Sequence, residues 1–263
     1  MTMRLPAMSR RDFAIQSAAS VALFQLPLAA AQHAEAVEQT GSMRTLRVVC
    51  VGAHPDDPES GCGGTLARYS QKGHHVTVIY LTRGEAGIRG KSHEEAAAVR
   101  TAEAEAACKI LGAKPVFAGQ IDGATAVDRA RTVALAALLA AEQPDVLFTH
   151  WPIDTHPDHQ AASLLALRAC LASGSRLPLF FFEVDSGYQT MAFSPTAYVD
   201  ITSVREKKKA ALFAHGSQNG EEIYRKHHEI MEGFRGREVG AAAAEAFVSL
   251  ARGNPNARLP GLD

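Results

Sequence analysis

Two short segments of this chain combine histidine, aspartate and proline in a pattern that suits metal-dependent chemistry. The first is residues 53–57 (AHPDD), and the second, much later in the chain, is residues 156–159 (HPDH). Together they offer three ligands for one metal ion and leave a carboxylate and an imidazole free beside it. A hydrolase that activates water on a metal needs this inventory. A structural zinc site would use all four positions, usually with cysteine, and would need no free neighbours.

The spacing within the segments assigns these residues to different tasks. His54 and Asp57 are three positions apart across a proline, so one turn can direct both side chains at a single ion. His159 completes a set of two imidazoles and one carboxylate, which leaves a position for water. This set suits zinc, although iron(II) accepts the same ligands. Asp56 is then free to accept a proton from the water.

The second segment also offers His156, three residues before His159. It can stabilise an oxyanion, or protonate a leaving amine if a carboxylate such as Asp158 keeps it cationic. Each segment has a structural alternative, since an aspartate can cap a turn and Asp158 can lie near the dipole of a helix start. Either segment alone would favour that alternative, whereas two segments that each follow a strand favour chemistry.

Continuous apolar runs alternate with helical patterns along the chain. The expected strands are 46–53, 76–81, 116–118, 145–150, 179–184 and 197–201, and the expected helices are 65–72, 92–111, 128–141, 160–172 and 204–214. This alternation predicts a mostly parallel sheet with helices on both faces, a Rossmann-like α/β three-layer sandwich. Ligands of such sheets bind at the carboxyl ends of the strands. We therefore expect both segments to meet there and form the active site.

A dinucleotide site is the main alternative for a strand followed by glycines. Residues 61–64 read GCGG rather than G-x-G-x-x-G, and an acidic loop separates the first strand from the helix expected at 65–72. No acidic residue ends the second strand to hold a ribose, because Thr82 and Arg83 stand there. The sequence therefore argues against nucleotide binding.

The overall composition narrows the class of protein. The 263 residues fit one α/β domain plus a short extra segment, and a net charge of −1 argues against a nucleic-acid binder. The lysine run 207–209 is expected on a solvated helix face beside Glu206. The chain has four cysteines, Cys50, Cys62, Cys108 and Cys170, which form no CxxC pair and are expected to be buried thiols. Cys62 is the exception to watch, because it lies in the glycine-rich turn next to the first motif.

The amino terminus resembles a twin-arginine export signal over residues 1–31. Arg10 and Arg11 precede a modestly apolar stretch (14–28), and residues 29–31 (AAA) offer a cleavage site. Polar residues interrupt the stretch, which argues against a membrane anchor. We expect a linker at 32–45, the domain at 46–253, a tail at 254–263, no membrane span in the mature chain, and a periplasmic or other extracytoplasmic location.

The pair AHPDD and HPDH resembles the zinc-dependent N-acetylglucosaminyl deacetylase superfamily, the PIG-L or LmbE-like proteins. Further matching features are residues 61–65 (GCGGT), 81–85 (LTRGE), Arg100 with Glu103, and 215–218 (HGSQ). The resemblance implies a zinc ion on His54, Asp57 and His159, Asp56 as general base, and His156 as electrophilic or acid partner oriented by Asp158. It also implies substrate binding by Arg100 and, less closely, by Arg89. One departure is Asp154, where some relatives carry a tyrosine that acts at the oxyanion.

These observations predict an exported zinc-dependent amidohydrolase that removes an N-acyl group, most simply acetyl, from an amino sugar or its conjugate. The substrate partner is thus a small N-acetylated sugar or glycoconjugate, and the sequence is compatible with a homo-oligomer. The alternatives are a thiol-conjugate amidase of the same superfamily, a metal-dependent phosphoesterase with two metals, and a non-catalytic carbohydrate-binding protein. The free Asp56 and His156 speak against the last, because binding alone needs neither.

Overall fold

The computed structural model describes residues 44–174, 177–250 and 258–262. The expected export signal (1–31) and most of the expected linker (32–45) lie outside the described residues, so export stays a prediction. No helix in the described part of the chain is both long and apolar enough to span a bilayer.

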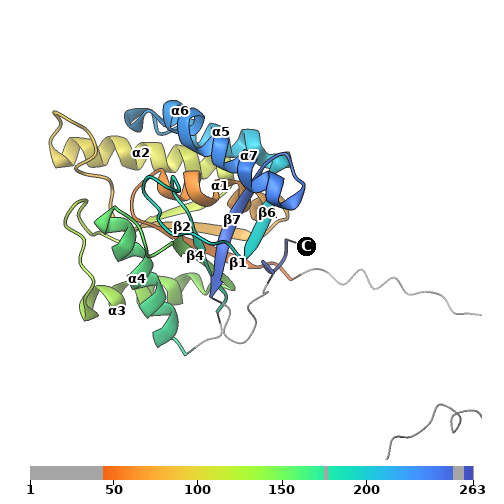
Figure 1. Ribbon diagram of the computed structural model, residues 1–263. Coiled ribbons are helices and arrows are strands. Elements are labelled where there is room, and N and C mark those ends of the chain that lie inside the picture. The colour runs from red at the N-terminus through yellow and green to blue at the C-terminus, as the bar shows by residue number, and fades with distance from the viewer. Residues whose placement is uncertain (1–43, 175–176, 251–257, 263) are drawn as a thin grey trace, which may run out of the picture. The chain divides into compact units, whose positions relative to one another are not determined.

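A seven-stranded sheet in the order β3-β2-β1-β4-β5-β7-β6 forms the centre of the fold (Figure 1). The first five strands in the chain are parallel, whereas β7 runs antiparallel to both β5 and β6. The predicted α/β class with a mostly parallel sheet is therefore confirmed. The strands are β1 (Arg47–Gly52), β2 (His75–Tyr80), β3 (Lys114–Phe117), β4 (Val146–His150), β5 (Leu179–Phe182), β6 (Ala197–Asp200) and β7 (Ala244–Leu250).

Helices cover both faces of this sheet, which gives the three layers (Figure 1). Alternate residues of each strand serve the two sides: Cys50 packs with α1 and α2, whereas Val49 packs with α3 and α4. One layer holds α1 (Asp57–Gln71), α2 (His93–Leu111), α5 (Arg205–Phe213), α6 (Gly220–Ile223) and α7 (Glu229–Val239). The other holds α3 (Arg129–Glu142) and α4 (Pro157–Ala172).

Helix α1 begins earlier than the sequence suggested. It starts at Asp57 and runs through the glycines with a kink at Cys62 (φ −145°, ψ 18°) instead of starting near residue 65. Glycines weaken a helix and so favoured a loop, but close packing requires them here. A Cβ on Gly61 would lie 2.4 Å from Phe182, and one on Gly64 would lie 2.7 Å from Ile201.

Capping residues fix the termini of two other helices. Ser92 caps α2 by accepting from the Glu95 N–H, and Gly112 ends it in the left-handed conformation (φ 77°). Helix α4 starts at Pro157 rather than 160, because His156 acts as its N-cap. The second motif is therefore the first turn of a helix.

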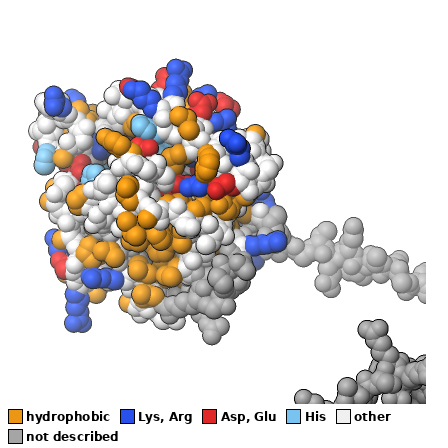
Figure 2. Space-filling view, viewed as in Figure 1, with side chains coloured by type: hydrophobic (Ala, Val, Ile, Leu, Met, Phe, Trp, Pro, Cys, Tyr) orange, Lys and Arg blue, Asp and Glu red, His pale blue; other side chains and the backbone are white. Residues whose placement is uncertain are grey.

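The carboxyl-terminal third departs most from the predictions. No element was expected over 216–250, which forms the 3-10 turn η2 (Gly216–Gln218), α6, the π-helical turn η3 (Tyr224–His228), α7 and β7. Lys208 is also not solvated. Its ammonium is buried between Glu232 and Glu245, at 2.9 and 2.8 Å. Figure 2 shows other charged side chains gathered on the surface at the top of the view, over these helices.

The end of the described chain packs on the domain. Leu259, inside the segment expected to be a tail, is buried in the core on the α1 side, and Tyr69 donates a hydrogen bond to the carbonyl of Pro260 at 2.9 Å. The four cysteines are buried and free, as predicted, and Cys50 Sγ lies 3.5 Å from Cys62 Sγ.

Candidate active site

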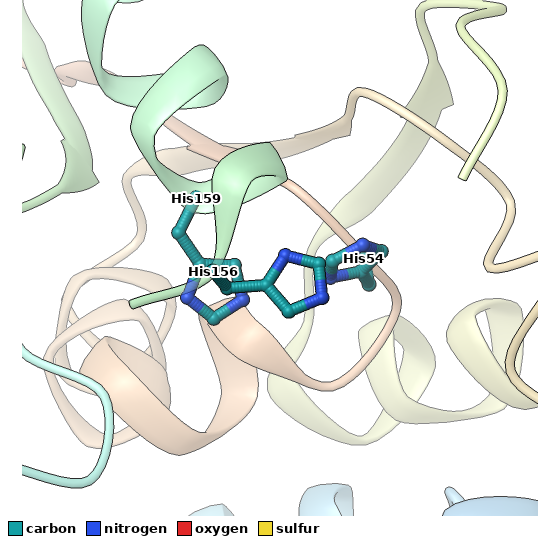
Figure 3. A group of neighbouring side chains, drawn as sticks. All are labelled: His54, His156 and His159. Carbon is teal, nitrogen blue, oxygen red and sulfur yellow. The ribbon is translucent and has the colours of Figure 1, made fainter. Parts of the chain in front are cut away.

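The predicted chemical residues meet in one cavity at the carboxyl ends of the strands. The loop after β1 supplies His54 and Asp56, and the start of α1 supplies Asp57. The start of α4 brings His156 and His159 from the loop after β4 to the same place, as Figure 3 shows for the three imidazoles. All five residues line a cavity of about 600 Å³.

Asp57 lies between the two predicted imidazole ligands. Its Oδ2 is 3.2 Å from His54 Nδ1, and its Oδ1 is 3.2 Å from His159 Nε2. Burial alone would raise the pKa of Asp57, but His159 and His150 lower it well below its ordinary value. The carboxylate is therefore ionised and sits at the positive end of α1. Asp57 thus adjoins both of the predicted imidazole ligands.

The second ring nitrogen of each ligand histidine meets a carboxylate. His54 Nε2 is 3.1 Å from Asp158 Oδ2 and 3.2 Å from Asp122 Oδ1. His159 Nδ1 is 3.2 Å from Asp154 Oδ1. Metal-bound histidines are commonly held this way, because the carboxylate fixes the tautomer and ring orientation.

This donor set fits a divalent metal ion. Burial would lower the pKa of His54, yet Asp122, Asp158 and Asp57 raise it well above its ordinary value, which shows the surplus of negative charge that a cation would meet. Donor atoms close enough to hold one ion form three overlapping groups: His54 with His156 and His159, Asp57 with His150 and His159, and His54 with Asp122 and Asp158. Among the described residues no single group holds all three predicted ligands, but His159 joins the group of His54 to the group of Asp57. Two imidazoles and a carboxylate suit zinc, and the same donors suit iron(II).

His150, the last residue of β4, is a neighbour that the sequence analysis missed. Its Nε2 lies 3.5 Å from Asp57 Oδ2 and accepts the backbone N–H of Ala53 at 3.1 Å. Burial, together with His159, lowers its pKa to about 4, so it is neutral. Since the Nε2 lone pair is engaged by Ala53, we assign His150 to support the metal loop rather than to bind the ion.

Asp56 is set apart from Asp57 by its backbone. Its φ of 110° lies in the left-handed region, which is strained for a non-glycine residue and turns its side chain away from that of Asp57. Its N–H donates to Glu59 at 3.1 Å, and its Oδ2 accepts from Arg100 at 3.1 Å. Burial raises the pKa of Asp56 to about 6, although Arg100 opposes the shift. A carboxylate with this pKa is ionised at neutral pH and can accept a proton.

Arg100 is a buried brace for this carboxylate. It is 3% exposed and donates to the carbonyl of Pro55 as well as to Asp56. Gly84 and Gly87 press on its guanidinium, so that a Cβ at either would come within 2.4 Å of it. Arg100 lines the cavity, whereas Arg89, the other residue expected to bind substrate, is exposed and does not line it.

His156 differs from the expectation in its charge. Its Nδ1 accepts the N–H of Asp158 at 3.2 Å, and burial, with His54 and His159 nearby, lowers its pKa. The Asp158 carboxylate does not hold it in a cationic form, because that carboxylate bonds instead to His54, Thr125 and the N–H of Gly123. His156 is therefore a neutral imidazole that carries its proton on Nε2.

Two of the aspartates at the site were not predicted as site residues. Asp122 follows the third strand, and Asp154 stands two positions before His156. Asp154 also accepts from the His156 N–H at 2.8 Å and from Thr190 at 3.0 Å. A signal was present for both, since each follows a parallel strand at the edge where ligands bind.

Known proteins with similar sequences and structures include several deacetylases. Residues 49–170 match the family model PIG-L, described as GlcNAc-PI de-N-acetylase. Diacetylchitobiose deacetylase of Thermococcus kodakarensis is 30% identical over 193 residues, 68% of this chain and 72% of that protein. The N,N'-diacetylchitobiose deacetylase structure from Pyrococcus horikoshii has a TM-score of 0.69 at 28% identity, covering 78% of this chain and 83% of that one.

One similar structure has a different activity in its description. The 4-carboxy-2-hydroxymuconate hydratase of Pseudomonas putida superposes with a TM-score of 0.68 at 25% identity, over 77% of this chain and 95% of that one. The same fold and comparable similarity therefore accompany both an amide hydrolase and a hydratase.

Proposed function

We propose that this chain, which belongs to the PIG-L family, removes an N-acyl group, most simply acetyl, from an amino sugar or its conjugate. The predicted resemblance is confirmed, and so, at the level of the family, is the class of enzyme, because the relatives are named deacetylases and deacetylases hydrolyse a carbon–nitrogen bond. The observation that carries the proposal is the separation of tasks between adjacent aspartates. Asp57 faces two imidazoles. Asp56 faces Arg100, and burial raises the pKa of Asp56 to about 6.

His54, Asp57 and His159 would hold the ion, for which we propose zinc. Such an ion, when bound, polarises an acyl oxygen and lowers the pKa of a water molecule. Asp122 and Asp158 face His54 Nε2, and Asp154 faces His159 Nδ1, so with the ion bound these carboxylates would accept the ring protons and leave the nitrogens that face Asp57 free to bind the ion.

Asp56 takes a proton from the attacking water at its carboxylate. Arg100 fixes the position of Oδ2, and the low polarity of the buried site keeps the carboxylate basic. His156 donates its Nε2 proton as a hydrogen bond to the acyl oxygen as negative charge develops there. Protonated Asp56 then returns its proton to the departing amine, so the base of the first step is the acid of the second.

A panel of substrates tests this proposal. We expect the purified zinc-loaded protein to release free amine from N-acetylated amino sugars, detected with an amine-reactive fluorophore. Side-by-side assays with a larger thiol-conjugated amide separate the amidase alternative, and two metals per chain would favour the phosphoesterase. Hydration of an unsaturated dicarboxylate without amine release would show the hydratase activity named for the Pseudomonas relative instead. Sugar binding without turnover would support the binding-protein alternative.

A further inference from the structure

A buried carboxyl group behind Asp56 has no task in the proposed reaction. Glu59 is 0% exposed and does not line the active-site cavity, so it does not face a substrate. A carboxyl group removed from water costs free energy unless hydrogen bonds or charges compensate for the loss. The partners of Glu59 therefore indicate what this residue does.

One oxygen of Glu59 holds the backbone of Asp56. Glu59 Oε2 accepts the N–H of Asp56 at 3.1 Å, which forms one half of a capping box at the start of α1. Asp56 has φ 110° and ψ −35°, whereas an N-cap residue usually adopts an extended conformation. The backbone of Asp56 is therefore strained, and such a conformation persists only where its surroundings hold it.

The other oxygen of Glu59 meets two side chains from distant parts of the chain. Tyr80, the last residue of β2, donates its hydroxyl to Glu59 Oε1, and His215 Nε2 lies 3.4 Å from the same oxygen. Both partners are 0% exposed. Burial would lower the pKa of His215, yet Glu59 raises that pKa above its ordinary value. Attraction between His215 and Glu59 thus adds to the hydrogen bond from Tyr80.

Tyr80 and His215 are themselves fixed in place. The Tyr80 ring stacks on that of Phe117, with centroids 5.4 Å apart and 23° between the ring planes. The His215 carbonyl accepts the N–H groups of Gln218 and Gly220, both at 3.1 Å. Glu59 is therefore held from the sheet and from the loop after α5.

These contacts hold one particular peptide group, the one that joins Pro55 to Asp56. Arg100 donates to its carbonyl oxygen, and Glu59 accepts from its N–H. A peptide group held at both ends cannot rotate, so the φ of Asp56 stays in the left-handed region. Arg100 also donates to Asp56 Oδ2 at 3.1 Å, which fixes the far end of the same residue.

We propose that Glu59, itself held by Tyr80 and His215, is a positioning residue that fixes the Pro55–Asp56 peptide group and so keeps the Asp56 carboxylate in place for proton transfer. This inference rests on the proposed function, in which Asp56 is the base. Without Glu59 the strained backbone relaxes, and the carboxylate leaves the position from which it takes a proton. Misplacement of a reacting group by about 1 Å can lower a rate by about a hundredfold.

A double-mutant cycle on the zinc-loaded protein tests this role through amine release from N,N'-diacetylchitobiose. Glu59→Ala should lower kcat by about tenfold to a hundredfold, with zinc retained and little change in KM. In an Asp56→Asn background the same change should lower kcat by no more than about twofold, because the base on which Glu59 acts is already lost. Losses that multiply would overturn the proposal, since Glu59 would then act through another residue. Loss of zinc from Glu59→Ala would also overturn it.

A conservative variant separates the hydrogen bond from the charge. Glu59→Gln should keep kcat within about threefold of the wild type, because a glutamine oxygen accepts the same N–H in a capping box. Equal losses in Glu59→Gln and Glu59→Ala would show that charge matters instead of the hold on Asp56, and would overturn the proposal.

Tyr80→Phe is a milder change, which serves the same test if Glu59→Ala yields no soluble protein. It removes one hydrogen bond to Glu59 and should lower kcat by about threefold to tenfold, an effect that disappears in the Asp56→Asn background. Tyr69→Phe is the matched control, because Tyr69 is also 0% exposed but donates its hydroxyl to the Pro260 carbonyl. Equal effects of Tyr80→Phe and Tyr69→Phe would contradict the proposal.

Crystal structures of the variants provide a readout that does not depend on turnover. Asp56 should leave the left-handed region in Glu59→Ala and stay near its φ of 110° in Glu59→Gln. An unchanged φ in Glu59→Ala overturns the positioning role, whether or not the wild type hydrolyses a sugar. A changed φ in a protein that releases no amine from any N-acetylated sugar supports the positioning role and overturns only the proposed function.

Discussion

The active-site cavity joins two regions that the chain builds in opposite ways. The metal region takes its residues from loops that follow the parallel strands β1 and β4, and its imidazoles and carboxylates are buried within 3.5 Å of one another. The Tyr188 cluster, which consists of Asp185, Tyr188 and His227, comes from a tight turn after β5 and from a π-helical turn ahead of the antiparallel strand β7. The ring of Tyr188 is exposed to solvent.

The difference in burial suits the metal region to chemistry and the exposed ring of Tyr188 to the selection of substrates. A buried cluster of charges has few workable arrangements, because every carboxylate and imidazole needs a partner, and a single change leaves another group unpaired. An exposed ring on an anchored turn has no such constraint, so it can be replaced without disturbing the metal region. We therefore expect changes in the first region to abolish the metal or the rate and changes in the second to alter which substrate is used.

The largest effect should come from the metal ligands. His54→Ala, Asp57→Ala and His159→Ala should each lose zinc and all activity, whereas Asp56→Asn should retain zinc, since Asp56 faces Arg100. Elemental analysis of the four purified variants measures this directly. A zinc-free Asp56→Asn would reverse the assignment of the paired aspartates.

The next largest effect concerns rate with the metal in place. Asp56→Asn should lower kcat about a hundredfold or more with little change in KM, as loss of a general base does. His156→Ala should also act on kcat, because its hydrogen bond strengthens only as charge develops. Asp128→Asn, at the exposed start of α3, is the matched control and should behave as wild type. A rise in KM alone for His156→Ala would contradict its role.

The same comparison explains what the sequence could predict. The metal region was predictable because apolar strands, proline-fixed motifs and the carboxyl-edge rule all act locally. The charge of His156 was not, because Asp158 bonds across the fold to His54 rather than to its near neighbour. The start of α1 was missed because its glycines are required by close packing against Phe182 and Ile201, which are distant in the sequence. Tyr188 and His227 likewise meet only through β5, β7 and the π-helical turn.

A smaller effect tests how the metal region is supported. Asp154→Asn keeps the shape of the side chain but removes the charge that faces His159 Nδ1, so zinc should bind about tenfold to a hundredfold more weakly. Competition with a fluorescent chelator measures the affinity without reference to turnover. Asp128→Asn again serves as the control. Unchanged zinc affinity would show that Asp154 only anchors the loop through Thr190.

The smallest effect concerns stability beneath the second region. His228 is 2% exposed at the end of the π-helical turn, and burial, with Lys208 and His227 nearby, lowers its pKa to about 3 despite a weak opposing effect of Asp57. The unfolded chain, whose histidine pKa is about 6.5, therefore binds more protons between about pH 3 and pH 6.5. Stability should fall as the pH drops through this window, by on the order of a few kcal/mol in total.

His228→Gln should cost about 1 kcal/mol at pH 7.5 and flatten the decline. Denaturant unfolding at pH 7.5, 6 and 5 measures both, with the exposed His93→Gln as control. Parallel declines in wild type and His228→Gln would show that a group other than His228 causes the acid sensitivity.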